Sequence, residues 1–289
     1  APGTTVKFAT EGSGLNVQGQ LHGVGTAGLP IVFTSIRDDD HGGDTNGDAA
    51  ATSPGPSQWG NLSFPSGTQG ALLEHTCILY GGAGSWAPVN IYDDDVTVRH
   101  SEIADSSANA AVYIENSSPT VENSLIHQAT YAGVWIRQMD DSHATSPRFT
   151  RNVIRDNGRG FEIQGTRTPV LRHNAIYNNA WQGLQYKGAS WDPCGSAPCE
   201  PRLDARQNWW GHASGPYEEH RNPFATGDAI DDYETYYAVD FIPWLEKPPT
   251  GTVPINALTL GLQSAPHVSP GGDHIYRMYV GNYRTQTDA

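Results

Sequence analysis

One pattern of apolar and polar positions returns six times along the chain. Each copy has an aliphatic or small residue, two variable residues, then Thr, Ser or Asn, one more residue and usually Ile. The copies are LEHTCI (73–78), VRHSEI (98–103), VENSLI (121–126), FTRNVI (149–154), LRHNAI (171–176) and, more loosely, ARQNWW (205–210). Repetition at steps of 22 to 34 residues predicts stacked supersecondary units rather than an ordinary globular core.

A second column of apolar residues follows the motif in the successive repeats. It reads VNI (89–91), AVYI (111–114), GVWI (133–136), GFEI (160–163) and GLQY (183–186). Alternation of this kind is typical of strands, and nothing between the two columns has the period of a helix. We therefore expect two short strands per repeat in an all-β, right-handed parallel β-helix from about residue 4 to residue 210.

The stacking predicts two internal columns of side chains. Ile103, Ile126, Ile154 and Ile176 should lie above one another inside the coil. The polar residue of each motif should form a ladder at one turn, made by Thr76, Ser101, Ser124, Asn152, Asn174 and Asn208. Asn suits such a ladder because it tolerates left-handed backbone and its amide can pair with the next rung.

The ends of the chain suggest further parts. Trp209 and Trp210, with 241–245, are expected to cap the last coil, because an open solenoid end exposes apolar side chains. We place the capped β-helix at residues 1–246 and a Pro-rich linker at 247–256. Residues 257–289 resemble the opening strands of a β-sandwich module, so the native protein is expected to be longer.

Charge and cysteine content narrow the classes of partner. The net charge of −14 argues against nucleic acid and against an anionic membrane surface. A run of 18 apolar residues is absent from the sequence, so no membrane span is expected. Cys194 and Cys199 are predicted to form a local disulfide, with metal binding by the pair as the alternative, and Cys77 to be a buried thiol.

Two long segments resemble a known class of protein. The run GLNVQGQLHGVGTAGLPIVFTSIRDDDHGGDTNGDA (14–49) is similar to the opening of bacterial secreted right-handed β-helix repeat proteins of the pectate-lyase-like superfamily. The segment QNWWGHASGPY (207–217), with VDFIPWL (239–245), resembles their closing segment, and residues 257–289 resemble immunoglobulin-like modules of bacterial surface proteins. The resemblance implies the β-helix fold and an extracellular or cell-surface location, but no single activity, since the superfamily holds lyases, hydrolases, epimerases, adhesins and structural domains.

The loop 37–58 is the candidate metal site. Oxygen ligands at alternate positions can surround one hard cation, and DTNGD supplies them in this order. The predicted ligands of a structural Ca²⁺ are Asp38, Asp40, Asp44, Asn46 and Asp48. Two departures from a calcium loop are Ala49, where Gly is usual, and Gly55, where a bidentate Glu is usual, so a solvated acidic loop remains the alternative.

Aligned repeats place polar and aromatic residues in two outward columns. The first contains Tyr113, Trp135, Glu162 and Gln185, and the next contains Glu115, Arg137, Gln164 and Lys187. An exposed aromatic ring beside polar groups can stack on a sugar, which makes Tyr113, Trp135, Arg137, Glu162 and Lys187 the candidate ligand-binding residues; ordinary strand surface is the alternative. No catalytic residue is assigned, because the ionisable groups spread along columns instead of converging.

Three functions remain open at this stage. The first is a non-catalytic structural or adhesive domain of a larger secreted or surface-anchored bacterial protein, which the lack of a catalytic constellation favours. The others are a polysaccharide lyase, epimerase or hydrolase, and a carbohydrate-binding module. The expected partners are other extracellular proteins or polysaccharides, with self-assembly into a fibre or surface layer as a further expectation.

Overall fold

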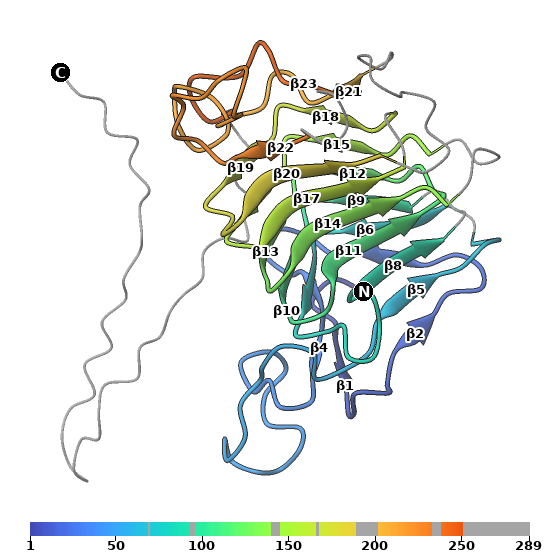
Figure 1. Cartoon of the computed structure of the whole chain (residues 1–289). Coiled ribbons are helices and arrows are strands. Elements are labelled where there is room, and N and C mark those ends of the chain that lie inside the picture. The colour runs from blue at the N-terminus through green and yellow to red at the C-terminus, as the bar shows by residue number, and fades with distance from the viewer. Residues whose placement is uncertain are drawn as a thin grey trace, which may run out of the picture.

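The chain winds into a coil of short parallel strands (Figure 1). The computed structural model describes residues 1–68, 70–92, 96–139, 145–165, 168–188, 202–232 and 238–250. Within these ranges the regular elements are strands, and no helix is present, so none could span a membrane. The strands form three sheets whose named pairings are all parallel.

Each sheet takes one strand from every turn of the coil. The first sheet contains β1 (Thr5–Phe8), β4 (Ile31–Ser35), β7 (Thr76–Leu79), β10 (Glu102–Ser106), β13 (Leu125–Ala129), β16 (Val153–Arg155) and β19 (Ala175–Tyr177). The second contains β2 (Leu15–Asn16), β5 (Leu62–Phe64), β8 (Val89–Tyr92), β11 (Ala110–Glu115), β14 (Ala132–Arg137), β17 (Arg159–Gln164), β20 (Gln182–Lys187) and β22 (Ile230–Asp231). The third contains β3 (His22–Val24), β6 (Ala71–Glu74), β9 (Val96–Arg99), β12 (Thr120–Glu122), β15 (Arg148–Thr150), β18 (Val170–Arg172), β21 (Leu203–Asp204) and β23 (Val239–Asp240). The seven strands of the first sheet give about seven turns, which confirms the predicted parallel β-helix.

The prediction of two strands per repeat is wrong, because each turn holds three. The repeated motif is itself two strands joined at a corner of one or two residues. The residue before the polar one is left-handed in every copy, with φ between 49° and 59° at His75, His100, Asn123, Arg151, His173 and Gln207. The left-handed residue is therefore not the ladder residue, and the argument that Asn is chosen for left-handed backbone fails at these positions.

The apolar interior follows the predicted column. Ile103 pairs with Ile126, Ile126 with Ile154 and Ile154 with Ile176 in the register of the first sheet. All four side chains are fully buried, which confirms the prediction. In-register stacking places each side chain on its equivalent one turn away, so a single continuous core runs along the coil.

The polar ladder is also confirmed, and its members are fully buried. The Oγ of Ser101 accepts from the backbone N–H of Thr76 at 3.1 Å, and the Oδ1 of Asn174 accepts from the N–H of Asn152 at 2.9 Å. Asn208 continues the series by accepting from the N–H of Asn174 at 2.8 Å. Each rung thus satisfies a backbone donor of the turn before it, which removes the cost of burying that group.

A second ladder, missed from the sequence, lies at the next corner. Asn157 accepts from the N–H of Ala129 at 3.0 Å, Asn179 from that of Asn157 at 3.2 Å, and Asp228 from that of Asn179 at 2.9 Å. Burial raises the pKa of the Asp228 carboxyl, while the hydrogen bonds from Asn179 and Asn178 oppose this. The spacing of 22 residues between Asn157 and Asn179, equal to that between Asn152 and Asn174, is the signal that could have revealed it.

Aromatic side chains close the last turn, as expected. Trp210 and Phe241 are buried in the main core, and Trp244 packs against it beside Phe241. The coil continues beyond residue 210, because β22 and β23 extend the second and third sheets. Asp93–Asp95, Cys194, Cys199 and the predicted β-sandwich segment 257–289 lie outside the described residues, as does most of the linker 247–256.

Candidate functional site

The outer face of the second sheet brings the predicted columns together. Tyr113 pairs with Trp135, and Glu162 with both Trp135 and Gln185, in the register of β11, β14, β17 and β20. The neighbouring column of Glu115, Arg137, Gln164 and Lys187 is in register as well. Parallel strands place these side chains about one strand spacing apart, so they form one continuous surface.

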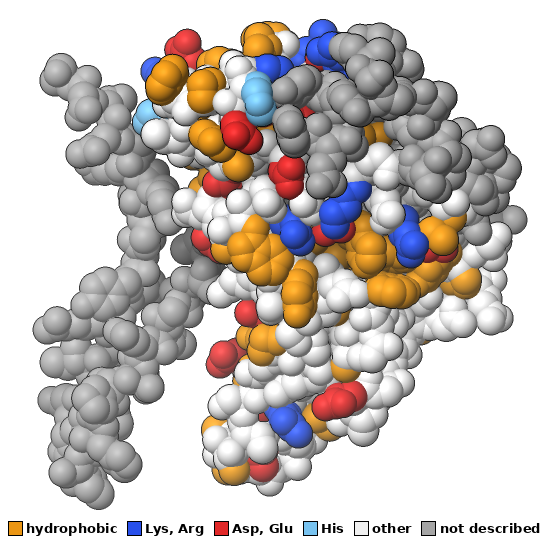
Figure 2. Space-filling model, in the orientation of Figure 1, with side chains coloured by type: hydrophobic (Ala, Val, Ile, Leu, Met, Phe, Trp, Pro, Cys, Tyr) orange, Lys and Arg blue, Asp and Glu red, His pale blue; other side chains and the backbone are white. Residues whose placement is uncertain are grey.

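Four aromatic residues of this face, Trp86, Tyr92, Tyr113 and Trp135, form what we call the aromatic platform. Trp86 stacks on Tyr113 with ring centroids 5.6 Å apart and meets Trp135 edge-on at 5.5 Å. Tyr113 was expected to be exposed, but its neighbours cover it completely, and Trp86 is the exposed ring at 43%. Figure 2 shows hydrophobic side chains gathered over the second sheet beside Lys and Arg.

Burial also sets the protonation of the platform. It raises the pKa of Tyr113 well above its ordinary value, and the Glu115 carboxylate, which accepts a hydrogen bond from the Tyr113 hydroxyl, adds to the shift. Burial raises the pKa of Tyr92 too. Both phenols are therefore neutral at physiological pH and act as hydrogen-bond donors and apolar surface.

Charged groups around the platform are mostly paired. Glu162 accepts from Lys187 Nζ at 2.7 Å through one oxygen and lies 3.3 Å from Arg159 Nη1 through the other. The Arg137 guanidinium lies over the Trp135 ring at 5.9 Å from its centroid. The charge of Arg137 and its hydrogen bond to the Tyr113 side chain oppose the rise in the pKa of Tyr113, so this guanidinium belongs to the platform.

A row of exposed side chains at the corner before this sheet was missed from the sequence. Trp86, Tyr131 and Trp181 occupy the same position of alternate turns, three residues before an apolar strand residue. Tyr131 and Trp181 are each 47% exposed. Tyr131 and Trp181 contact each other at 5.9 Å. The recurrence of an aromatic residue just before VNI, GVWI and GLQY was the available signal.

A shallow hollow lies at the N-terminal end of the same sheet, where β2 forms part of its lining. It has a volume of about 510 Å³ and is lined by residues 11–16, Gly60, Asn61, Ala83 and Gly84. Glycine backbone forms much of its wall. The hollow continues the surface of the second sheet beyond the platform.

The acidic loop 37–58 projects from the coil near β1 and β4 (Figure 1). Asp39, Asp44 and Asp48 each offer a carboxylate oxygen, and these oxygens lie within 4.8 Å of one another. Such a cluster could hold a cation. Local desolvation and the charges of Asp44 and Asp48 raise the pKa of Asp39.

The structure separates two of the predicted metal ligands from this cluster. Asp38 is buried, where it accepts from Thr34 Oγ1 at 2.6 Å and contacts His41 Nδ1 at 2.8 Å. Asp40 is exposed and outside the cluster, while Asn46 donates its amide to Asp48 at 2.9 Å. Asp39, which is not among the predicted ligands, belongs to the cluster instead, because the side chain of Asp38 is turned into the interior.

Cys77 is a free, buried thiol on the outer face of the first sheet. Its sulfur lies 4.0 Å from the Glu102 carboxylate, which also contacts His127 Nε2 at 2.9 Å. Burial and the Glu102 charge raise the pKa of Cys77 to about 12. The thiolate needed for nucleophilic or metal chemistry is therefore suppressed.

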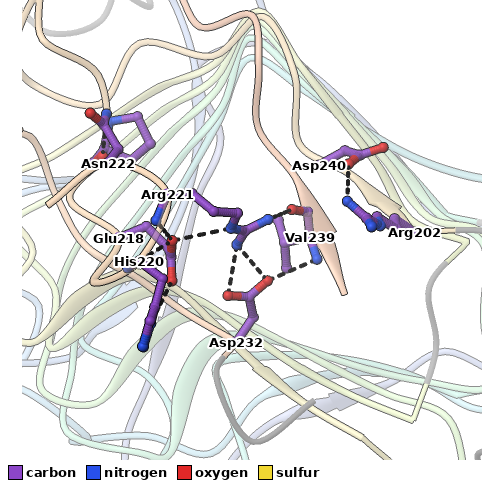
Figure 3. Close-up of polar contacts among 9 residues, drawn as sticks. Arg202, Glu218, His220, Arg221, Asn222, Asp232, Val239 and Asp240 are labelled. Atoms are coloured by element: carbon purple, nitrogen blue, oxygen red, sulfur yellow. Dashed lines mark hydrogen bonds and ion pairs between the residues drawn. The ribbon is translucent and has the colours of Figure 1, made fainter. Parts of the chain in front are cut away.

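A buried ionic cluster ties the cap together (Figure 3). Arg221 pairs with both oxygens of Asp232, at 2.9 and 2.8 Å, and with Glu218 at 3.1 Å. It also donates to the carbonyl of Val239 at 2.7 Å and lies over the Phe241 ring. Among the described residues the cluster joins the two segments that form the cap, so we assign it a structural role.

Comparison with known proteins supports the fold. Residues 66–191 match the family model of the right-handed β-helix region. The match spans β6 to β20, which carry the aromatic platform, and it establishes the hand of the coil. No curated protein and no solved structure matches the chain. The right-handed β-helix is a fold shared by many functions, so function has to be argued from the side chains.

Proposed function

We propose that this right-handed β-helix is a non-catalytic adhesive domain that binds carbohydrate along the outer face of its second sheet. The aromatic platform is the observation that carries the proposal. Clustered aromatic rings with polar neighbours offer an apolar surface for the C–H face of a sugar and hydrogen-bonding groups for its hydroxyls. The hollow at the N-terminal end of the same sheet offers further surface for a polymeric ligand.

The rigidity of the platform favours binding. Trp86, Tyr113 and Trp135 contact one another, and their backbone lies in or next to paired strands. Little side-chain freedom is left to lose when a ligand binds, so more of the contact energy appears as affinity.

The pairing of Glu162 favours binding over catalysis. Each of its oxygens is engaged by a cation, and Glu115 accepts a hydrogen bond from Tyr113. A general acid or base has to reach a substrate proton, and an inverting or retaining glycosidase needs two such carboxyl groups. These two carboxylates instead organise the surface.

We propose further that the domain lies outside the cell, joined to further domains of a secreted or surface protein.

Binding is tested with the full chain and a panel of soluble polysaccharides, neutral and acidic, by affinity electrophoresis and calorimetry. We expect Trp86→Ala and Trp135→Ala each to weaken binding about tenfold, which corresponds to about 1.4 kcal/mol. Trp209→Ala is the matched control, because Trp209 packs beside Tyr177 on the first sheet. If neither platform substitution changes the affinity for the polysaccharide, the outer face of the second sheet is not its binding site.

Catalysis is tested with the same polymers by following unsaturated products, reducing ends and epimerisation. We expect no turnover. Activity that disappears in Glu162→Gln would overturn the non-catalytic assignment and convert this face into an active site.

We propose in addition that loop 37–58 holds a structural calcium ion at Asp39, Asp44 and Asp48. Two buried oxygens support this, since Asp39 Oδ1 and Asn46 Oδ1 accept no hydrogen bond from the described residues. Ca²⁺ prefers oxygen ligands of this kind. Calcium should raise the melting temperature, and Asp39→Asn should abolish the increase while Asp40→Asn preserves it; an equal response of both variants would refute the site.

A further inference from the structure

The corner between the first and second sheets contains a pocket that the proposed function does not use. It has a volume of about 270 Å³ and is lined by Gln128, Ala129, Thr130, Asp156, Asn157, Gly158, Ala180 and Trp181. These residues come from the corners of three successive turns. We call this feature the turn pocket. Pockets for drug-sized ligands measure about 300–1,000 Å³, so this one suits a smaller molecule.

A gap in the corner row of aromatic residues creates the turn pocket. Gly158 stands between Tyr131 and Trp181 in the register of the coil. A Cβ at Gly158 would lie 2.3 Å from the carbonyl oxygen of Tyr131 and 3.0 Å from Trp181 Cζ3. Only glycine therefore lets the Trp181 ring lie over this corner.

The turn pocket is held in shape before any ligand arrives. Asn157 in its floor belongs to the second ladder and bonds the turns on both sides, to Ala129 N at 3.0 Å and Asn179 Oδ1 at 3.1 Å. The Arg159 guanidinium lies 4.8 Å from the centroid of the Trp181 ring and holds it from one side. A preformed pocket avoids the ordering cost that weakens small ligands.

Polar side chains with spare hydrogen-bonding capacity surround the ring. Gln128 and Thr130 are exposed, and among the described residues neither side chain has a hydrogen-bond partner. Asp156 is also exposed and pairs with Arg155 through one carboxylate oxygen, which leaves the other oxygen to accept. An indole face beside an amide, a hydroxyl and a carboxylate matches a ligand with one apolar face and several hydroxyl groups.

We propose that the turn pocket binds a single pyranose residue, as a free sugar or as the end of a glycan chain. The ring would stack on Trp181 and its hydroxyls would bond to Gln128 and Asp156. This site is separate from the aromatic platform and does not depend on polymer binding there. One ring makes few contacts, so we expect a dissociation constant on the order of 1 mM.

Saturation-transfer NMR on the full chain tests the proposal, with glucose, galactose, mannose, N-acetylglucosamine and glucuronic acid as probes. At least one sugar should show saturation mainly on the C–H groups of one ring face. Trp181→Ala should weaken its binding at least about tenfold. Gln128→Gly should also weaken binding while keeping Trp181, and glycine suits the φ of 55° at this position.

Trp135→Ala separates this site from the platform, because Trp135 does not line the turn pocket. The proposal predicts unchanged monosaccharide binding in that variant, whatever happens to polysaccharide binding. Absence of signal from all five sugars would overturn it. Binding that survives in Trp181→Ala, or that is lost in Trp135→Ala alone, would overturn it as well.

Discussion

Replacement of Arg221 by Ala should destabilise the cap of the β-helix strongly. Arg221 is the counter-charge for two buried carboxylates, since the side chains of Glu218 and Asp232 are 2% and 0% exposed. Removal of one partner of a buried ion pair typically costs about 3–5 kcal/mol, because the remaining charge is desolvated and unpaired.

The remaining contacts place the expected cost at the lower end of this range. Glu218 still accepts from the backbone N–H groups of His220 and Arg221, and Asp232 still accepts from that of Val239 at 2.9 Å. We therefore expect the free energy of unfolding to fall by about 3 kcal/mol at pH 7.5.

The loss should depend on pH in a defined direction. Burial raises the pKa of Asp232 even with Arg221 present, whose charge lowers it. Without Arg221 the folded-state pKa rises further above the unfolded value. Between these two values the folded variant binds a proton that the unfolded chain does not, so the variant gains stability as the pH falls. The difference in the free energy of unfolding between the variant and the wild type should therefore be smaller at pH 5 than at pH 7.5.

Urea unfolding at pH 7.5 and pH 5 measures the free energy of unfolding of the Arg221→Ala variant, with Arg206→Ala as the control. Arg206 pairs with Asp204 at 2.9 Å but is 43% exposed, so its loss should cost far less stability than the loss of Arg221. Hydrogen exchange at Val239 and Ile230 would show whether the cap opens separately from the coil. The reasoning would be refuted if Arg221→Ala lowered the free energy of unfolding no more than Arg206→Ala does. It would also be refuted if the loss in Arg221→Ala were larger at pH 5 than at pH 7.5.

Three further predictions concern the corners and the core. Asn174→Ala should cost about 3–5 kcal/mol in urea unfolding, because it removes the side-chain partners of the buried Asn152 N–H and Phe149 carbonyl groups. Asn174→Ser should cost less, as Ser fills this position at Ser101 and Ser124; equal costs would contradict the ladder. Burial, with the adjacent charge of His100, lowers the pKa of His75 in the folded protein, so the stability that neutral His75 contributes should be lost as the pH falls below about 6.5. His75→Asn, which copies Asn123 at the same position of a later turn, should make the free energy of unfolding depend less on pH; an unchanged pH profile in this variant would contradict the prediction. A thiol reagent should leave Cys77 unmodified in the native protein. In denaturant without reductant it should label Cys77 alone if Cys194 and Cys199 form a disulfide, whereas three labels per chain would exclude that disulfide.

The sequence was sufficient for the parts of the structure that repeat. Residues such as Ile126 and Trp135 could be aligned because parallel, in-register turns repeat the same environment. The third strand was missed because the corner that a left-handed residue such as His100 begins is only one or two residues long, and so short a corner leaves no visible break in the pattern.

Features outside the repeat were harder to predict. Arg221, Glu218 and Asp232 occur once, in a segment with no equivalent to align, and only the fold brings them together. Asp39 replaced Asp38 as a candidate ligand because the direction of a side chain in an irregular loop depends on local turns and not on spacing. Exposure of Tyr113 was misjudged because Trp86, a corner residue, covers it.

The first ladder changes its chemistry along the coil, and this has a mechanical consequence. The hydroxyls of Ser101 and Ser124 donate to carbonyls of their own turn, at Arg99 and Glu122. The amides of Asn152, Asn174 and Asn208 donate instead to the preceding turn, at Val121, Phe149 and Leu171. Ser101 also reaches the Leu73 carbonyl of the preceding turn, but only at 3.4 Å, whereas the three Asn amides reach theirs at 2.9, 2.9 and 2.8 Å. Each Asn therefore adds a shorter hydrogen bond between turns than either Ser does. Under tension applied along the axis, the hydroxyl-bearing turns should separate first, so the N-terminal half would yield while the half that carries the turn pocket stays wound.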